Sequence, residues 1–335
     1  MQTIEQLRSG ALVGIRRLKL CCGLTRFPTE IYDLADTLEI LDLSGNQLSE
    51  LPEDLHRLKK LRIIFCSDNW FTELPAVLGR CAELSMVGFK ANQIRRVPPA
   101  SLPEKLRWLI LTDNEIEELP SELGACLQLQ KLMLAGNKLR VLPESLVNCQ
   151  RLELVRIAAN QLETFPDWLL SLPRLSWLAY SGNPFSYHWE QRAQATSHID
   201  EIRWDALTVE QLLGEGASGV IYRALHTQAS AKVKPVAVKL FKGAMTSDGL
   251  PQCEMTASIH AGKHPSLINV IGKIIGHPAD VEGLVMELIS PDFRNLAGPP
   301  SLDSCTRDIY PEALLFDLSA VLSMANSIAS VGGHL

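Results

Sequence analysis

The sequence of 335 residues predicts an α/β solenoid of stacked coils, followed by a smaller α+β domain. Two observations carry this prediction. Asparagines recur at a nearly constant spacing through the first half, whereas the second half contains a glycine-rich stretch, residues 213–222 (LGEGASGVIY), and then β-branched segments. A chain of this length can bury two separate cores. We therefore expect two domains with different architectures.

The solenoid prediction rests on seven asparagines spaced by 23 residues, with one step of 22, at positions 46, 69, 92, 114, 137, 160 and 183. The first six follow the frame LxxLxLxxNxLxxLP or close variants of it, as in LRWLILTDNEIEELP of residues 106–120, whereas the last repeat is broken after Asn183 (NPFSYHW). One coil cannot bury its own apolar side, so only a stack of such coils is stable. We expect the asparagine amide to satisfy backbone groups where each chain segment turns away from its strand.

This frame resembles the leucine-rich repeat family, in its cytoplasmic type of about 23 residues, and covers roughly Leu18 to Phe185. The resemblance implies a domain over residues 1–185 with about seven to eight repeats. Residues 186–206 contain no glycine or proline, so they are expected to form a linker or a helix that caps the solenoid.

The residues six and four positions before each asparagine should lie on the concave sheet, and many of them are apolar. Exposed apolar area often marks an interface. We therefore predict a docking face for a protein partner or substrate, made of Ile63, Phe65, Trp108, Ile110, Met133, Leu154 and Trp177. The alternative is that the second half of the chain, or a flanking helix, covers this patch.

Three cysteines occupy one repeat position, three residues before a repeat-opening leucine: Cys81, Cys126 and Cys149. We interpret them as small buried hydrophobic residues that stay reduced in a cytosolic compartment. The sequence has no CxxC pair, so a structural zinc site is not expected.

Charge and hydropathy argue against two classes of partner. The net charge is −6 and no basic run occurs, which argues against a broad nucleic-acid face. The first residues lack the pattern of a secretory signal, and no stretch of about 18 uninterrupted apolar residues suggests a membrane helix. We expect a cytoplasmic protein without nucleic-acid or membrane partners.

The second half contains the frame Gly214-x-Gly216-x-x-Gly219, which two unrelated nucleotide-binding folds use. A dinucleotide-binding fold requires a helix to open at this loop. Here the β-branched segment VIYRAL follows instead, and then a polar turn and PVAVKLF. The order of strand, glycine loop, strand, turn and strand favours a kinase small lobe.

From these segments onward the chain resembles the protein kinase family, because LGEGASGVIY, VAVK and LVMELI match its glycine-rich loop, third strand and hinge in order. The resemblance implies a kinase-like small lobe with a partial large lobe over residues 207–335. It makes Lys239 the phosphate-binding lysine and Glu254 its partner in the active state. The residues that it places around ATP are Leu213, Gly214, Gly216, Gly219, Ile221, Ala237, Lys239, Met286, Glu287 and Leu288.

Plainer interpretations exist for the same residues. Lys239 can be an ordinary lysine at a strand end, and Glu254 a solvated helix glutamate. Ser218 stands where many kinases carry an aromatic residue at the loop tip. His260 and His264 have the spacing of a helical metal pair, but the sequence His264-Pro265 also fits a kinase turn, so no metal site is expected there.

Residues 311–331 show a helical apolar stripe, which the kinase resemblance would bury in the large lobe. The sequence contains no HRD or DFG triplet, and the family places its base and its magnesium ligands after this helix. Two interpretations therefore remain. The first is a shortened Ser/Thr leucine-rich repeat kinase that uses ATP, with Mg²⁺ only if the missing part is present. The second is a noncatalytic interaction protein with a vestigial nucleotide-binding lobe. In either case residues 1–335 alone are predicted to be inactive in phosphoryl transfer.

Overall fold

The computed structural model describes residues 2–196, 199–216, 218–228, 230–243, 245–246, 248–298, 310 and 315–334. The chain divides into two compact units. Unit 1 comprises Met1–Arg192 together with Ala244–Cys253, and unit 2 comprises Ala193–Gly243 together with Glu254–Leu335.

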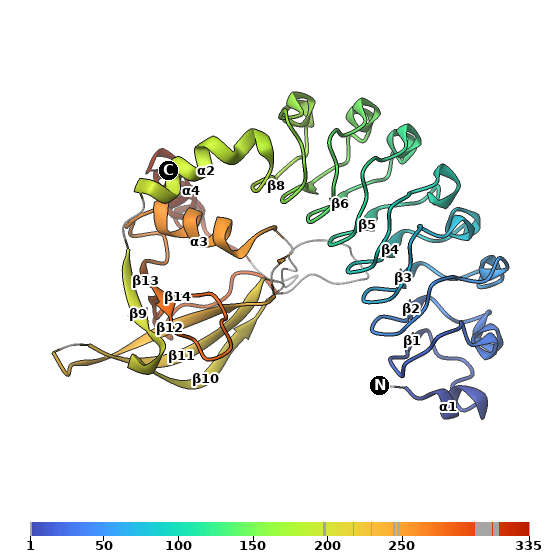
Figure 1. Cartoon of the computed structure of the whole chain (residues 1–335), viewed down its shortest axis with the longest axis horizontal. Helices are drawn as coiled ribbons and strands as arrows, with labels where there is room; N and C mark the ends of the chain where they lie inside the picture. The colour runs from blue at the N-terminus through green and yellow to red at the C-terminus, as the bar shows by residue number, and fades with distance from the viewer. Residues whose placement is uncertain are drawn as a thin grey trace. The chain divides into compact units, whose positions relative to one another are not determined.

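Unit 1 is a stack of coils, each of which contributes one short strand to a parallel eight-stranded sheet in the order β1 to β8 (Figure 1). From the second strand on, the three strand residues stand six, five and four positions before each repeat asparagine. The strands are β1 Arg17–Lys19, β2 Ile40–Asp42, β3 Ile63–Phe65, β4 Met86–Gly88, β5 Trp108–Ile110, β6 Lys131–Met133, β7 Leu154–Arg156 and β8 Trp177–Ala179. The repeat frame thus places the strands where the sequence predicted them.

Short 3₁₀ segments form the opposite side of the coils, and most begin directly after a proline, whose fixed φ suits the first turn. They are η1 Thr29–Leu34, η2 Leu55–Arg57, η3 Ala76–Arg80, η4 Pro99–Ser101, η5 Ser121–Ala125, η6 Glu144–Asn148, η7 Asp167–Ser171 and η8 Pro184–Ser186. Two α-helices flank the array, α1 Ile4–Arg8 and α2 Tyr187–Thr196. A capping box between Thr3 and Gln6 starts α1, and its buried Leu7 covers the apolar end of the first coil.

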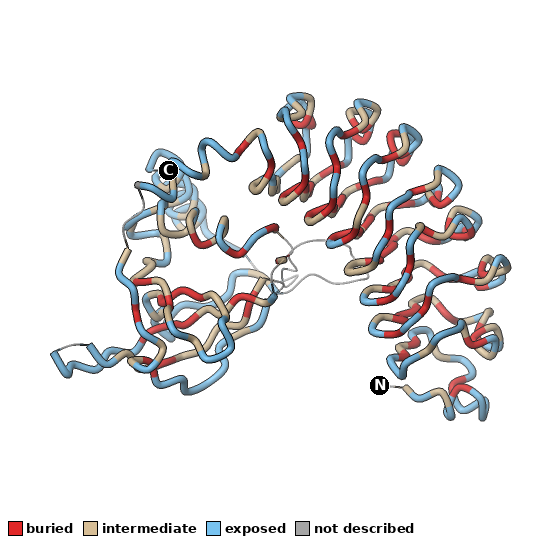
Figure 2. Tube along the Cα trace, in the orientation of Figure 1, coloured by how far each residue is buried: buried red, intermediate tan, exposed pale blue. Residues whose placement is uncertain are grey.

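The core of unit 1 runs through the interior of the coils as one continuous hydrophobic cluster (Figure 2). The middle residue of each strand from β1 to β7 is almost completely buried, for example Leu41 and Leu132. Phe71 and Phe89 from successive repeats pack edge to face, with ring centroids 5.0 Å apart. Each coil therefore buries its apolar side on its neighbours, as the repeat pattern requires.

The repeat asparagines link successive coils through hydrogen bonds. In the coil of Asn114, the side-chain Oδ1 accepts from the backbone N–H of Ile94 at 3.0 Å. Its Nδ2 donates to the carbonyls of Phe89 at 2.9 Å and Leu111 at 3.0 Å. Ile94 and Phe89 belong to the preceding repeat, whereas Leu111 belongs to the same one. One buried side chain therefore satisfies backbone groups of two coils, as we expected from the sequence.

The three cysteines at the shared repeat position are buried free thiols, as predicted. Burial raises the pKa of Cys126 to about 11, and burial next to Cys126 raises that of Cys149 to about 12. Because these pKa values lie above the ordinary value, the neutral thiols stabilise the fold fully below about pH 9, and this contribution is lost as the pH rises through 11 to 12.

We expect iodoacetamide at pH 8 to alkylate Cys126 and Cys149 at least about 100-fold more slowly than the exposed Cys21, because only the thiolate reacts and access is blocked. Peptide mapping by mass spectrometry after timed quenching measures the three rates on one sample. Equal rates in the folded protein would show that these thiols are not core residues.

Unit 2 contains a six-stranded sheet in the order β10-β11-β12-β14-β13-β9. Its strands are β9 Asp200–Arg203, β10 Leu207–Glu215, β11 Gly219–Thr227, β12 Val233–Phe241, β13 Val270–Ile275 and β14 Gly283–Glu287, and its helices are α3 Pro251–His260 and α4 Leu318–His334. A 3₁₀ segment, η9 Trp204–Ala206, joins β9 to β10. Strands β10, β11 and β12 form an antiparallel meander. The chain then passes through α3 to β13, and β14 returns between β12 and β13, antiparallel to both. The first three residues of α3, Pro251–Cys253, belong to unit 1, and the rest of the helix belongs to unit 2.

Strand β9 was not expected, because residues 186–206 were predicted to form a linker or a capping helix. Helix α2 accounts for the first part of this span, but β9 joins the sheet of unit 2 by pairing in parallel with β13. The reason is burial: Ile202 enters the sheet core, and the ring of Trp204 packs on His277 with centroids 4.3 Å apart. This span therefore contributes to two units.

Helix α4 carries the apolar stripe predicted for residues 311–331, of which 311–314 lie outside the described residues. None of its described residues is buried, and Leu315, Leu318 and Leu322 are 90%, 74% and 53% exposed. The stripe that the kinase resemblance would bury is therefore open to solvent in this chain.

Candidate functional site

The concave sheet of unit 1 is less exposed than the sequence suggested. Of the seven residues predicted to form a docking face, Ile63, Trp108 and Leu154 are only 2%, 8% and 6% exposed, so the expectation of an exposed patch was wrong for them. Neighbouring strands lie close enough for their side chains to cover one another. The Lys131 ammonium, for example, lies 3.8 Å from the centre of the Trp108 ring.

The other four residues of that predicted face, Phe65, Ile110, Met133 and Trp177, are half-buried. The first three lie in register with Gly88 across four neighbouring strands, β3 to β6. The Phe65 ring leans over Gly88, because a Cβ added there would lie only 2.5 Å from Phe65 Cδ1. The result is a track of apolar side chains across the sheet, which we call the apolar track (Phe65, Gly88, Ile110 and Met133).

The apolar track ends at a polar cluster that the sequence did not predict. Arg156 continues the same register on β7, and its Nε donates to Oδ1 of Asp248 at 2.8 Å. Trp177 donates its indole N–H to the same oxygen at 2.9 Å. Asp248 is far away in sequence but belongs to unit 1, because the stretch Ala244–Cys253 packs with the repeats.

In unit 2 the predicted glycine-rich loop is the connection of the β10–β11 hairpin, where Gly216 N–H donates to the Gly219 carbonyl at 2.9 Å. The three glycines have different surroundings. A Cβ on Gly219 would lie 2.6 Å from the carbonyl oxygen of Leu240, so only glycine lets β11 approach β12 here. Gly214 and Gly216 have nothing within 4 Å at the same position, so their backbones border open space.

Lys239 and Glu254 meet in unit 2, where the Lys239 Nζ forms an ion pair with Oε1 of Glu254. Both side chains are mostly shielded from solvent. The hydroxyl of Ser218, at the hairpin connection, also reaches that oxygen at 3.4 Å. The second carboxylate oxygen, Oε2, is buried and has no hydrogen-bond partner among the residues that the structure describes.

The remaining residues of the predicted nucleotide site lie on adjacent strands. Ile221 is the direct register partner of Lys239, and Ala237 is that of Met286. Glu287 ends β14, and Leu288 directly follows it. Leu213 lies at the hairpin end of β10 and is exposed. The structure thus brings the glycine hairpin, Lys239, Glu254 and the β12–β14 pair together at one part of the sheet.

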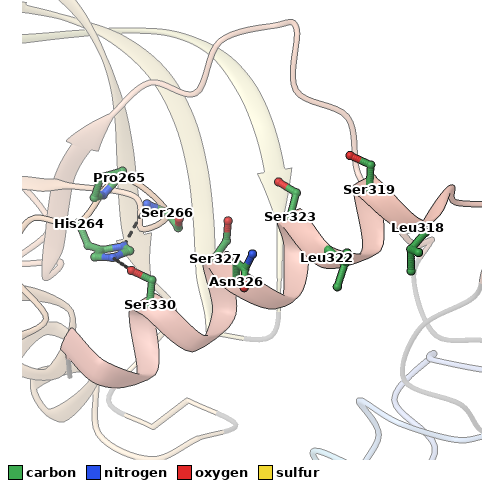
Figure 3. Close-up of a pocket in the computed structure, with 10 residues that line it drawn as sticks. All are labelled: His264, Pro265, Ser266, Leu318, Ser319, Leu322, Ser323, Asn326, Ser327 and Ser330. Atoms are coloured by element: carbon green, nitrogen blue, oxygen red, sulfur yellow. Dashed lines mark hydrogen bonds between the residues drawn. The ribbon is translucent and has the colours of Figure 1, made fainter.

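Among the described residues, the cavities of unit 2 include two that lie elsewhere. The larger, about 750 Å³, is an open groove between residues 264–266 and the Ser-rich side of α4, where His264 Nε2 and Ser330 Oγ lie 3.0 Å apart (Figure 3). The smaller, about 400 Å³, is lined by Asp200, Lys263 and Asn269 among others. Neither cavity includes Lys239, Glu254 or the three glycines.

Metal-ligand clusters and membrane-spanning helices are both absent from the described residues. No group of three or more His, Cys, Asp or Glu side chains in this part of the chain could hold a metal ion. Among the same residues, none of the helices combines the length and the apolar character that crossing a lipid bilayer requires.

The comparison with family models agrees with the repeat architecture. The family model described as Leucine Rich Repeat matches residues 37–58. Among solved structures, a leucine-rich repeat protein of Leptospira interrogans is 25% identical over 56% of this chain and 53% of its own, with a TM-score of 0.40. An internalin of Listeria monocytogenes is 22% identical over 47% of this chain and 51% of its own, with a TM-score of 0.39. The matched part therefore spans about half the length of these two structures, and no curated protein matches the sequence.

Proposed function

We propose that this leucine-rich repeat protein binds a protein partner on the concave sheet of its repeats. The observation that carries the proposal is the apolar track, in which four neighbouring strands present no charged side chain at the same register position. Half-buried apolar side chains on a rigid sheet gain from further burial without much loss of conformational freedom. The track is therefore a preformed binding surface.

A second feature of the same sheet supports the proposal. The indole N–H of Trp108 is buried and has no acceptor within the described part of the chain. A buried donor without an acceptor costs about 1–3 kcal/mol. If the Lys131 side chain moves aside, a carbonyl of a partner can accept a hydrogen bond from this N–H. Binding would then remove the free-energy cost of the unpaired donor.

Site-specific photocrosslinking in native cells tests the proposal. We expect p-benzoylphenylalanine at Ile110, on the apolar track, to give one dominant crosslinked protein. The same group at Leu127, which is 59% exposed on the loop before β6, is the control for accidental contacts. The proposal fails if both positions give the same adducts, or if Ile110 gives none while circular dichroism shows that the variant is folded.

A second candidate function is nucleotide binding by unit 2, supported by the Lys239–Glu254 pair next to the glycine hairpin. The residues fit ATP in one testable respect: open space borders Gly214 and Gly216, where phosphate oxygens could approach the backbone. Lys239 and the hairpin would hold the phosphates, and Ala237, Met286, Glu287 and Leu288 would surround the adenine. ATP would supply the phosphoryl group for transfer to a Ser or Thr hydroxyl.

In this candidate function Glu254 holds the Lys239 ammonium in place. Without such a partner, the flexible lysine side chain would not keep its charge at one position near the phosphates. Transfer would also need a base and Mg²⁺, which the kinase resemblance assigns to motifs that are not found in residues 1–335. The noncatalytic interpretation, in which unit 2 retains at most weak nucleotide binding, is compatible with the same geometry.

A further inference from the structure

The concave sheet of unit 1 already holds a short peptide segment, which comes from the chain itself. Strand β12 ends at Phe241 and α3 begins at Pro251, and the stretch between them contains Met245–Leu250. We call Met245–Leu250 the resident segment; its residue 247 lies outside the described residues. It belongs to unit 1 and contacts the last three repeats.

Hydrogen bonds between Thr246 and Gly249 hold the described residues of the resident segment on either side of Asp248. Thr246 and Gly249 exchange backbone hydrogen bonds of 2.8 and 3.4 Å, and the buried Thr246 hydroxyl donates to the Gly249 carbonyl at 2.9 Å. Gly249 has a φ of +121°, which side chains rarely adopt, and a Cβ there would lie 2.6 Å from Ala158 Cβ. The resident segment therefore requires glycine directly after Asp248.

The carboxylate of Asp248 is bound by groups that point at it from two neighbouring strands. Arg156 offers Nε at 2.8 Å and Nη2 at 3.5 Å to its two oxygens, and Trp177 offers its indole N–H at 2.9 Å. Only 14% of the Arg156 side chain and 27% of the Asp248 side chain remain exposed. Charge-assisted hydrogen bonds with this degree of shielding are stronger than those of an exposed ion pair.

Small residues make room for the rest of the segment. The residue before each repeat asparagine has a positive φ, and in the last three repeats it is Gly136, Ala159 and Gly182. A Cβ on Gly136 would lie 2.9 Å from Met245 Cε, and one on Gly182 would lie 3.3 Å from Leu250 Cδ1. The equivalent residue in two earlier repeats is aspartate, Asp68 and Asp113. Gly45 and Ala91 are also small, but three consecutive small residues occur only in the last three repeats, next to Arg156.

We propose that the surface around Arg156 and Trp177 is a recognition site for an acidic peptide of the pattern apolar-x-x-Asp-Gly-apolar, and that the resident segment is its intramolecular competitor. The inference rests on the proposed protein-binding role of the repeats and adds the chemical class of the partner. Because the resident segment is tethered, its effective concentration is in the millimolar range for a short flexible connection, so an external peptide must displace it. A partner with this motif would bind tightly only when the resident segment is released, or when further contacts of the partner with the repeats raise its affinity enough to displace the segment.

The test uses the full chain and a fluorescein-labelled hexapeptide, Met-Thr-Ser-Asp-Gly-Leu, which is the sequence of residues 245–250. We expect the Asp248→Ala variant, whose own segment lacks the carboxylate, to bind this peptide at least about tenfold more tightly than the unmodified chain does. A peptide with Asn in place of Asp should lose about tenfold in affinity, because it loses the charge. Fluorescence anisotropy measures all four dissociation constants.

Two further variants show which residues recognise the peptide. In the Asp248→Ala background, Trp177→Phe removes one N–H but keeps an aromatic ring, and Arg156→Lys keeps the charge but loses the planar fork. Each substitution should lower the affinity for the Asp peptide more than the affinity for the Asn peptide. Equal affinities of the two peptides for folded Asp248→Ala protein would overturn the inference. It would also be overturned if this variant forms a dimer in which two copies exchange their resident segments. If the peptide fails while the Ile110 crosslink persists, the repeats bind a partner but not through this motif.

Discussion

Replacing Asn114 with alanine is expected to lower the free energy of unfolding of the repeat array by about 3–5 kcal/mol. The side chain is buried. It accepts from the backbone N–H of Ile94 in the preceding coil, and it donates to the carbonyl of Phe89 in that coil and to two carbonyls of its own coil. Alanine leaves these groups in the interior with neither a protein partner nor water. Urea unfolding followed by far-UV circular dichroism measures the loss.

The matched control is Asn148→Ala, because Asn148 is an exposed asparagine in η6 of the same array. A surface substitution of this kind should change the free energy of unfolding by no more than about 0.5 kcal/mol. If the two variants are equally stable, the asparagine hydrogen bonds do not hold the coils together, and leucine burial alone accounts for the stack.

The Lys239→Met variant is expected to bind a fluorescent ATP analogue at least about tenfold more weakly than the unmodified chain. Methionine keeps the length and the apolar stem of the side chain but removes the ammonium, which would face the phosphates and which Glu254 now holds. Glu254→Gln should produce a smaller loss, because the lysine remains but is no longer fixed. Equilibrium titration at constant salt concentration measures both variants.

Lys234→Met is the control for this experiment, since Lys234 is exposed on the same strand, β12. It removes an equal charge from the unit but lies away from the hairpin. Equal affinities for the Lys239 and Lys234 variants would rule out the proposed phosphate contact. Absence of any analogue binding to the unmodified chain would favour the noncatalytic interpretation of unit 2.

The repeat array could be predicted from the sequence almost residue by residue, because each coil repeats the same local and nearest-neighbour interactions. The position of Trp108 on a strand, for example, follows from its distance to Asn114. The burial of Trp108 could not be predicted in this way. The side chain that lies over the Trp108 ring is Lys131, and the repeat frame leaves that position on the next strand variable.

The missed features share a physical cause, which is contact between segments distant in sequence. Strand β9 has only four residues, and it is a strand because it pairs with β13 about 70 residues later. Asp248 carries no motif around it, and its role appears only once Arg156 and Trp177 converge on its carboxylate. For the glycine hairpin and Lys239, in contrast, the sequence could predict that they lie on neighbouring strands, because the strands that carry them are consecutive.

The hydrogen bonds of the repeat asparagines also constrain how such a chain can change during evolution. Each amide bonds to its own coil and to the coil before it, so a complete copy of 22 or 23 residues supplies every donor and acceptor that its neighbours need. A duplication of one whole repeat can therefore be inherited without loss of folding, whereas an insertion of a few residues between strand and asparagine would leave two coils unpaired. The array is expected to lengthen and shorten among descendants in whole repeats, with point changes accumulating on the concave strand positions between them.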